Sequence, residues 1–129
     1  MTTDTPTGQG PEIGRFEPIF PVRDLRRSLE HYKLLGFDVD DYEEGDEYSF
    51  ARRDGNQLHL TLTPDMDPLV NAACVYFRVD DAAALADQWR ASGAGGTGLA
   101  HDTDYGMCES AHVDPDNNMI KFGSRITQR

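Results

Sequence analysis

The sequence predicts an α+β fold of two tandem βαβββ modules, whose strands form a curled, mostly antiparallel sheet of open half-barrels with the helices on the outer face. The first observation is that a helix cap, an aromatic helix position and a closing glycine recur at one spacing of 57 residues. The repeated residues are Val22, Asp24, Tyr32 and Gly36, which recur as Val79, Asp81, Trp89 and Gly93. The second observation is that residues 54–60 resemble residues 116–122, a turn followed by a strand, at a spacing of 62. Internal similarity of this kind is typical of a duplicated unit.

The chain of 129 residues has the length of one domain. Residues 1–14 are rich in Thr, Gly and Pro, so we expect a disordered tail. They lack the basic start and apolar centre that are typical of a signal peptide. Residues 15–129 form the single domain. Its first module covers about 15–63, a linker covers 64–71, and the second module covers about 72–124.

The first module begins with a strand over 15–22, whose two prolines exclude full pairing along its length. Asp24 is expected to cap a helix with an apolar stripe, and Gly36 supplies the left-handed residue that ends it. Strands follow over 37–42, 47–53 and 56–63. The last two strands are joined by Asp54-Gly55, a strong signal for a tight hairpin.

The second module begins with a strand over 73–79. Asp80 or Asp81 caps its helix, in which Leu85 and Trp89 face inward. The glycine cluster over 93–98 lacks the Gly-Lys-Ser/Thr ending of a phosphate loop, so we expect a mobile loop there. A short strand is expected within 99–101, and a final hairpin pairs 108–113 with 118–124.

The charge of the chain excludes some partners. Asp and Glu number 23 and Lys and Arg 12, which gives a net charge of −11. Nucleic acids and anionic membranes carry phosphates that such a surface repels. A generally acidic surface or a site for a cationic ligand both remain open. Cys74 and Cys108 form no CxxC pair, so free thiols and a cytoplasmic location are expected, and no apolar run is long enough to span a membrane.

Alternation along the strands separates an apolar face, which packs under the helices, from a mixed polar and aromatic face, which lines a concave cavity if the sheet curls. The residues expected to be buried are Phe16, Phe20, Val22, Leu58, Leu60, Leu62, Val75, Phe77, Val79, Ile120 and Phe122.

The repeat also places four polar residues in register on the cavity face. Glu17 corresponds to Cys74 at the spacing of 57, and His59 corresponds to Lys121 at the spacing of 62. Glu17 and His59 lie on neighbouring strands, so we expect them to hydrogen-bond, directly or through water. Whether His112 faces the cavity is left open.

These segments resemble a known family. The matching stretches are Val22-Arg23-Asp24 through Phe37, Leu58-His59-Leu60, Tyr105-Gly106, and Asp114-Pro115-Asp116 through Phe122. Over residues 16–124 the chain resembles the vicinal oxygen chelate superfamily, which includes glyoxalases, extradiol dioxygenases and bleomycin-resistance proteins. The resemblance implies paired βαβββ modules, a homodimer, and cavities that in many members are shared between chains.

Metal-dependent members carry His, Glu or Gln ligands at four strand positions, which match Glu17, His59, Cys74 and Lys121 here. Lys121 departs from that pattern, because deprotonating an ordinary lysine at pH 7 costs about 4.6 kcal/mol. We therefore expect no bound metal and no cofactor. The alternative is one divalent ion on Glu17, His59 and Cys74. An internal ammonium at Lys121 needs a counter-charge, from Glu17 or another acid of the cavity.

The resemblance favours a metal-free binding protein that sequesters a cationic or aromatic small molecule, such as a bleomycin-type glycopeptide, in a cavity at the dimer interface. The residues expected to bind it are Glu17, Tyr48, His59, Cys74, Tyr76, Arg78, Tyr105 and Lys121. The alternative is an enzyme, a lyase, isomerase or dioxygenase of the glyoxalase type, using Glu17, His59 and Cys74 on a metal or Glu17 and His59 as an acid–base pair. A third possibility is a cavity filled by the protein's own side chains.

Overall fold

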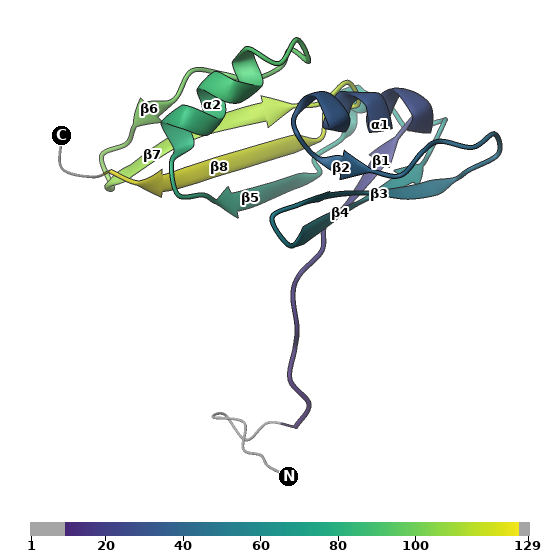
Figure 1. The fold of residues 1–129 in the computed structure, drawn as a ribbon, viewed down its shortest axis with the longest axis horizontal. Helices are drawn as coiled ribbons and strands as arrows, with labels where there is room; N and C mark the ends of the chain where they lie inside the picture. The colour runs from purple at the N-terminus through teal and green to yellow at the C-terminus, as the bar shows by residue number, and fades with distance from the viewer. Residues whose placement is uncertain (1–9, 127–129) are drawn as a thin grey trace.

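A computed structural model describes residues 10–126 of the chain. Two four-stranded sheets lie next to each other, and both helices cover the same side of them (Figure 1). The opposite side of the sheets is uncovered and is called the open face below. Ile19, His59, Tyr76 and Lys121 lie on it. No described helix is long and apolar enough to cross a membrane.

The first module contains one helix and four strands. Their bounds are β1 Ile19–Val22, α1 Leu25–Leu34, β2 Asp38–Val39, β3 Tyr48–Arg53 and β4 Asn56–Leu62. The strand order is β1-β4-β3-β2, with β1 parallel to β4 and the other pairs antiparallel. Asp54 and Gly55 both have positive φ, of 51° and 80°, as a two-residue hairpin turn between β3 and β4 requires.

The second module repeats this plan after a short 3₁₀ helix, η1, at Pro68–Val70. Its elements are β5 Cys74–Arg78, α2 Ala82–Arg90, β6 His101–Asp102, β7 Met107–Val113 and β8 Met119–Arg125. The order β5-β8-β7-β6 and the parallel pair β5–β8 match the first module. The predicted α+β fold of two modules is confirmed.

The strand register agrees with both spacings of the repeat. Ile19 pairs with His59 in the first module, and Tyr76 pairs with Lys121 in the second. Tyr76 follows Ile19 by 57 residues and Lys121 follows His59 by 62, which are the two spacings of the repeat. The duplication therefore extends to individual cross-strand pairs.

The helix ends follow their sequence signals. Asp24 accepts a hydrogen bond of 3.1 Å from the backbone N–H of Arg27, and Asp81 accepts one of 3.0 Å from Ala84. These bonds satisfy N–H groups that have no partner inside the helix. Gly36 and Gly93 adopt φ of 90° and 87° after the helices, which a side chain at that position would oppose.

The first strand is shorter than predicted. It begins at Ile19 instead of Arg15, because Pro18 has no N–H to donate to the ladder. Phe16, expected in the core, is 86% exposed, so that prediction is wrong. The segment before β1 extends away from the sheets (Figure 1). Of the predicted tail, residues 1–9 lie outside the described residues and residues 10–14 are exposed without helix or strand.

The core lies between the helices and the sheets. Phe20, Leu60, Ile120 and Phe122 are buried as predicted, whereas Val75, Phe77 and Val79 are only half-buried. Trp89 of α2 is buried and donates from its indole N–H to the backbone oxygen of Leu35, at 2.9 Å. This bond joins the helix of one module to the end of the other module's helix.

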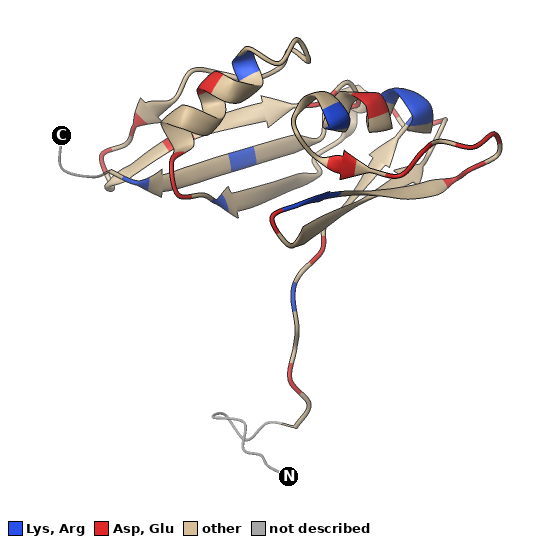
Figure 2. Ribbon diagram, in the orientation of Figure 1, with Lys and Arg blue, Asp and Glu red and all other residues tan. Residues whose placement is uncertain are grey.

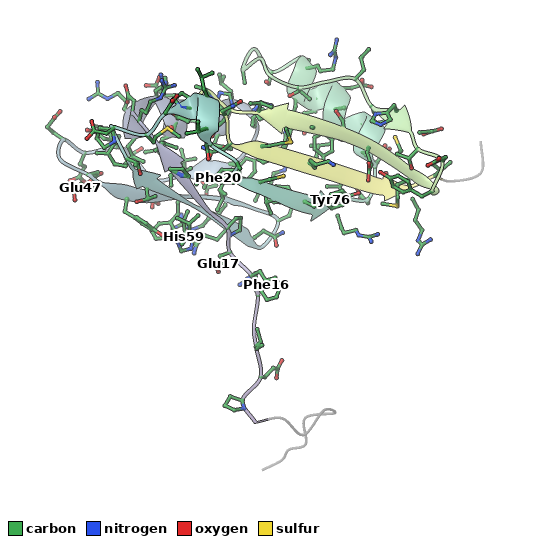
Figure 3. All side chains as sticks on the ribbon, turned by 180° about the vertical axis from the view of Figure 1, so that it is seen from behind. Phe16, Glu17, Phe20, Glu47, His59 and Tyr76 are labelled. Atoms are coloured by element: carbon green, nitrogen blue, oxygen red, sulfur yellow. The ribbon has the colours of Figure 1, made fainter. Side chains whose placement is uncertain are left out.

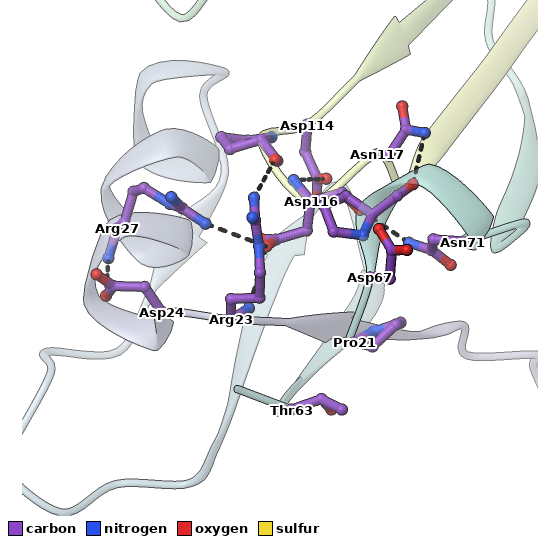
Figure 4. A network of polar contacts seen from close by, with 12 residues as sticks. Pro21, Arg23, Asp24, Arg27, Thr63, Asp67, Asn71, Asp114, Asp116 and Asn117 are labelled. Atoms are coloured by element: carbon purple, nitrogen blue, oxygen red, sulfur yellow. Dashed lines mark hydrogen bonds and ion pairs between the residues drawn. The ribbon is translucent and has the colours of Figure 1, made fainter. Parts of the chain in front are cut away.

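A buried charge cluster also locks the two modules together (Figure 4). Asp116, in the turn between β7 and β8, is fully buried and accepts from Arg23 Nε at 2.7 Å and Arg27 Nη2 at 3.1 Å. Asn118 donates to the backbone oxygen of Pro21 in β1 at 2.9 Å. The turn of the second module is thereby fixed against the start of the first.

Candidate functional site

The open face of the first module carries a chain of hydrogen bonds around Glu17 and His59, which Figure 3 shows near each other. His59 Nε2 lies 2.7 Å from Glu17 Oε1, which confirms the predicted contact between these two residues. Tyr48 Oη lies 2.7 Å from His59 Nδ1 on the other side of the ring. Gln57 donates to the same carboxylate oxygen of Glu17 at 3.0 Å. Glu17 stands just before β1, Tyr48 starts β3, and Gln57 and His59 lie on β4.

These contacts fix the charge of Glu17. The hydrogen bonds from His59 and Gln57 lower the pKa of its carboxyl group, and the nearby Arg15 acts in the same direction. Glu17 is therefore ionised at neutral pH and holds the imidazole in one orientation. The rings of Tyr48 and Phe50 stand edge-on to His59, with centroids 5.6 and 4.8 Å away, so the imidazole is enclosed on two sides.

The open face of the second module carries a different cluster, centred on Glu109 of β7. Tyr76 donates to Glu109 Oε2 at 2.8 Å and Tyr105 donates to Glu109 Oε1 at 2.6 Å. Glu109 itself is only 8% exposed. The two phenol bonds lower the pKa of the carboxyl group, and Lys121 and His101 add a smaller effect. The pKa values of both phenols are raised, that of Tyr76 by desolvation and then its bond to Glu109, that of Tyr105 first by its bond.

Gly123 makes the contact between Tyr76 and Glu109 possible. It lies on β8 between the strands that carry these two residues and pairs with Glu109 in the ladder. A Cβ at Gly123 would lie 2.0 Å from the Tyr76 hydroxyl oxygen and 3.0 Å from Glu109 Cγ. The phenol therefore crosses β8 only because no side chain stands there.

The remaining predicted residues lie on the same face without joining either cluster through a direct hydrogen bond. Cys74 and Arg78 are exposed on β5, and Lys121 is exposed on β8. In Figure 2 basic positions lie on β5 and β8, while acidic positions gather in the loops around them. The predicted counter-charge of Lys121 is Glu17 or another acid of the cavity. In the structure this acid is Glu109, whose pKa the ammonium of Lys121 helps to lower.

A cavity of about 1010 Å³ opens between the two modules. Three of the eight predicted binding residues line it, namely Glu17, Tyr76 and Arg78. Its apolar lining comes from Phe37, Leu58, Val75, Phe77, Leu85 and Trp89. This volume is that of a site for a drug-sized molecule, so the protein's own side chains do not fill the space.

His112 faces the core and not the open face. It is fully buried on β7, and its Nε2 lies 2.7 Å from Nε2 of His31 on α1. Thr97 Oγ1 lies 2.7 Å from the other ring nitrogen. Together with the bond from Val113 N–H to Gly96 O, of 2.9 Å, this contact ties the glycine loop expected to be mobile to β7.

Comparison with known proteins places the fold. The family model of the Glyoxalase/Bleomycin resistance protein/Dioxygenase superfamily matches residues 13–122. The chain belongs to this superfamily. Among solved structures, the bleomycin resistance determinant encoded on the transposon Tn5 is similar, with 23% identity and a TM-score of 0.76 over 89% of this chain and 100% of that one.

Two other similar structures carry a ligand. A bleomycin-binding protein complexed with bleomycin is 23% identical, with a TM-score of 0.75 over 88% of this chain and 100% of that chain. The bleomycin-binding protein of Streptomyces verticillus, complexed with copper(II)-bleomycin, is 21% identical, with a TM-score of 0.70 over 88% and 97%. No curated protein matches the sequence.

Of the four positions that match the superfamily's metal ligands, Glu17 and His59 contact each other. Cys74 contacts only its own neighbour's backbone oxygen, at 3.9 Å. An ammonium at Lys121 adds no donor to the set. Over residues 10–126, no three His, Cys, Asp or Glu side chains converge as ligands.

Sequence reasoning missed Glu109 and Gly123. At the spacing of 62, Glu109 follows a like residue, Glu47, but the strand register gives it another counterpart. Glu109 pairs with Gly123, where the first module pairs Tyr48 with Thr61. Alternation along β7 could have placed Glu109 on the open face, two residues from Ala111, which pairs with Lys121. Only the strand register brings Glu109 opposite Gly123, within reach of Tyr76.

Proposed function

We propose that the chain is a metal-free small-molecule-binding protein that holds a cationic or aromatic ligand in the cavity between its modules and on the adjoining open face, with the site shared between two copies of a homodimer. The observation that carries this proposal is the ionised Glu17, oriented by His59 and Gln57 beside a cavity of about 1010 Å³. A fixed carboxylate attracts a cation, and oriented aromatic faces attract both cations and flat rings.

The two modules offer different parts of this site. Tyr76 and Tyr105 present half-exposed and exposed rings, held in place by Glu109. Lys121 and Arg78 lie beside those rings, so a cationic group is expected nearer Glu17 and a flat ring nearer the second module. The solved bleomycin-binding proteins, with a similar fold, support bleomycin as the first ligand to test.

Calorimetric titration with metal-free bleomycin tests the proposal. We expect saturable binding that Glu17→Gln weakens by about tenfold, because a charge-assisted contact is lost. Asp65→Asn, an exposed acid in the linker, is the matched control and should bind as the wild type does. Absence of heat at saturating drug would exclude a bleomycin-type ligand. Stoichiometric metal in protein purified without chelator would exclude the metal-free site.

Exposed apolar surface supports the proposed homodimer. Ile13 and Phe16 are 78% and 86% exposed in the segment before β1, and β5 is an open sheet edge. Such groups favour pairing with a second chain. Light scattering coupled to size-exclusion chromatography should give twice the chain mass, and Phe16→Ser should shift the equilibrium toward monomer. A monomer at high concentration would contradict the shared cavity.

A further inference from the structure

Tyr48, His59 and Glu17 form a relay on the open face of the first module, in which each group contacts the next at 2.7 Å. The three residues come from β3, β4 and the segment before β1. The side chains of His59 and Glu17 are 20% and 30% exposed, and Tyr48 is 43% exposed. The phenol is thus the member of the relay most open to a molecule from solution.

The arrangement fixes where the protons lie. The carboxylate of Glu17 has no proton to donate, so it accepts a hydrogen bond from His59 Nε2. A neutral imidazole that carries its proton on Nε2 has a free electron pair on Nδ1. His59 Nδ1 is then the acceptor for the Tyr48 hydroxyl. A nucleophile, a base and a group that orients the base therefore follow one another in order.

The three tyrosines of the open face provide a comparison within one molecule. Tyr76 and Tyr105 donate to the carboxylate of Glu109, and that contact raises the pKa of both phenols, after desolvation in the case of Tyr76. A phenol held in this way is a poorer nucleophile. Tyr48 instead donates to an imidazole, which takes up a proton more readily than a carboxylate near neutral pH. Of these three residues, only Tyr48 has an imidazole as its partner.

We propose that Tyr48 is the nucleophile of an acyl-transfer site that accepts aryl esters, an activity that shares Glu17 and His59 with the ligand binding proposed above. Tyr48 Oη forms a bond to the ester carbonyl carbon while its proton passes to His59 Nδ1. The tetrahedral intermediate expels the acidic phenol of the aryl ester, which leaves with that proton, and the acyl group stays on Tyr48. Water, deprotonated by His59, then releases the acid and restores the phenol. Glu17 is a positioning residue that stabilises the transient imidazolium.

Reaction of the full-length protein with p-nitrophenyl acetate tests the proposal, with mass spectrometry used to locate the acetyl groups. Exposure alone predicts faster labelling of Tyr105, which is 66% exposed against 43% for Tyr48. The relay predicts the reverse order, with Tyr48 ahead by about tenfold or more, the lower range of general-base assistance. Faster labelling of Tyr105, or equal labelling of the two, would overturn the proposal.

Variants separate the roles of the relay. Tyr48→Phe should abolish the fast release of p-nitrophenolate, and His59→Gln should slow it by about a hundredfold. Glu17→Gln should slow the labelling of Tyr48 and leave that of Tyr105 unchanged, because only the relay loses the group that orients His59. Tyr42→Phe, a tyrosine stacked under Arg26, is the matched control and should react as the wild type does. Unchanged labelling of Tyr48 in His59→Gln would exclude the relay. The labelling of Tyr48 is measured without bleomycin. The acyl-transfer proposal and the ligand-binding proposal can therefore each fail while the other stands.

Discussion

Tyr76 reaches across the backbone of Gly123 and donates a hydrogen bond of 2.8 Å to Glu109, two strands away. The bond fixes an aromatic ring flat on the open face. It also covers a carboxylate that would otherwise be exposed to solvent. A glycine weakens the interior of a strand. Its presence at position 123 is explained by the space that Tyr76 needs to reach Glu109.

Substitution of Gly123 by alanine should therefore displace the Tyr76 ring without unfolding the protein. The new Cβ would lie 2.0 Å from the phenol oxygen, at the far end of a side chain that can rotate away. We expect a loss of about 1 kcal/mol in the free energy of unfolding, the value of one hydrogen bond. Urea denaturation measures it. Gly14→Ala, where nothing lies within 4 Å, should leave stability unchanged. An equal loss in both variants would contradict the steric explanation.

Glu109→Gln should lower the pKa of Tyr76 and of Tyr105. The carboxylate raises both values in the wild type because it stabilises the protonated phenols. Alkaline titration of ring-labelled tyrosine by NMR should show two of the five tyrosines ionising earlier in the variant. Glu12→Gln, on the exposed segment before β1, serves as the control. Unchanged titration of both phenols would mean that these hydrogen bonds do not persist in solution.

Asp116→Asn should destabilise the protein by about 2 kcal/mol, because the buried carboxylate loses its charge-assisted hydrogen bonds from two partly exposed guanidinium groups. Asp116 is fully buried and receives Arg23 and Arg27 at 2.7 and 3.1 Å. Asp40→Asn removes an exposed pair with Arg52, also at 3.1 Å, and should cost less than about 1 kcal/mol. Comparison of the two urea midpoints measures the difference. Similar midpoints would show that the buried cluster does not hold the modules together.

The pair of His31 and His112 should make the protein sensitive to acid. Burial lowers the pKa of His112 from 6.5 to about 4, and burial also lowers that of His31. The unfolded chain therefore binds these protons at a higher pH than the folded chain does. The stability present above pH 6.5 falls as the pH drops from 6.5 toward 4, by about 3 kcal/mol for His112.

Urea denaturation at pH 7 and pH 5 measures the part of this loss that falls between those two values, about 2 kcal/mol for His112. His112→Gln should flatten the pH dependence, since glutamine does not ionise. His101→Gln, an exposed histidine of β6, should retain it. An identical slope for the wild type and His112→Gln would show that the buried pair is not responsible.

Features that depend on neighbouring residues along the chain were predictable. The caps at Asp24 and Asp81 and the hairpin at Asp54-Gly55 each follow from one short segment, because the energies involved are local. The contact between Glu17 and His59 is long-range. It could be predicted because the duplication fixed which strands are neighbours.

What the sequence determined by itself was the two-module fold, the helix and turn boundaries set by local hydrogen bonds, and the first half of the candidate site. The tertiary structure alone decided that Phe16 is exposed and that Glu109 sits under two tyrosines. These features depend on which atoms meet across strands far apart in the chain. A shift of one residue in register would have sent Glu109 to the opposite face.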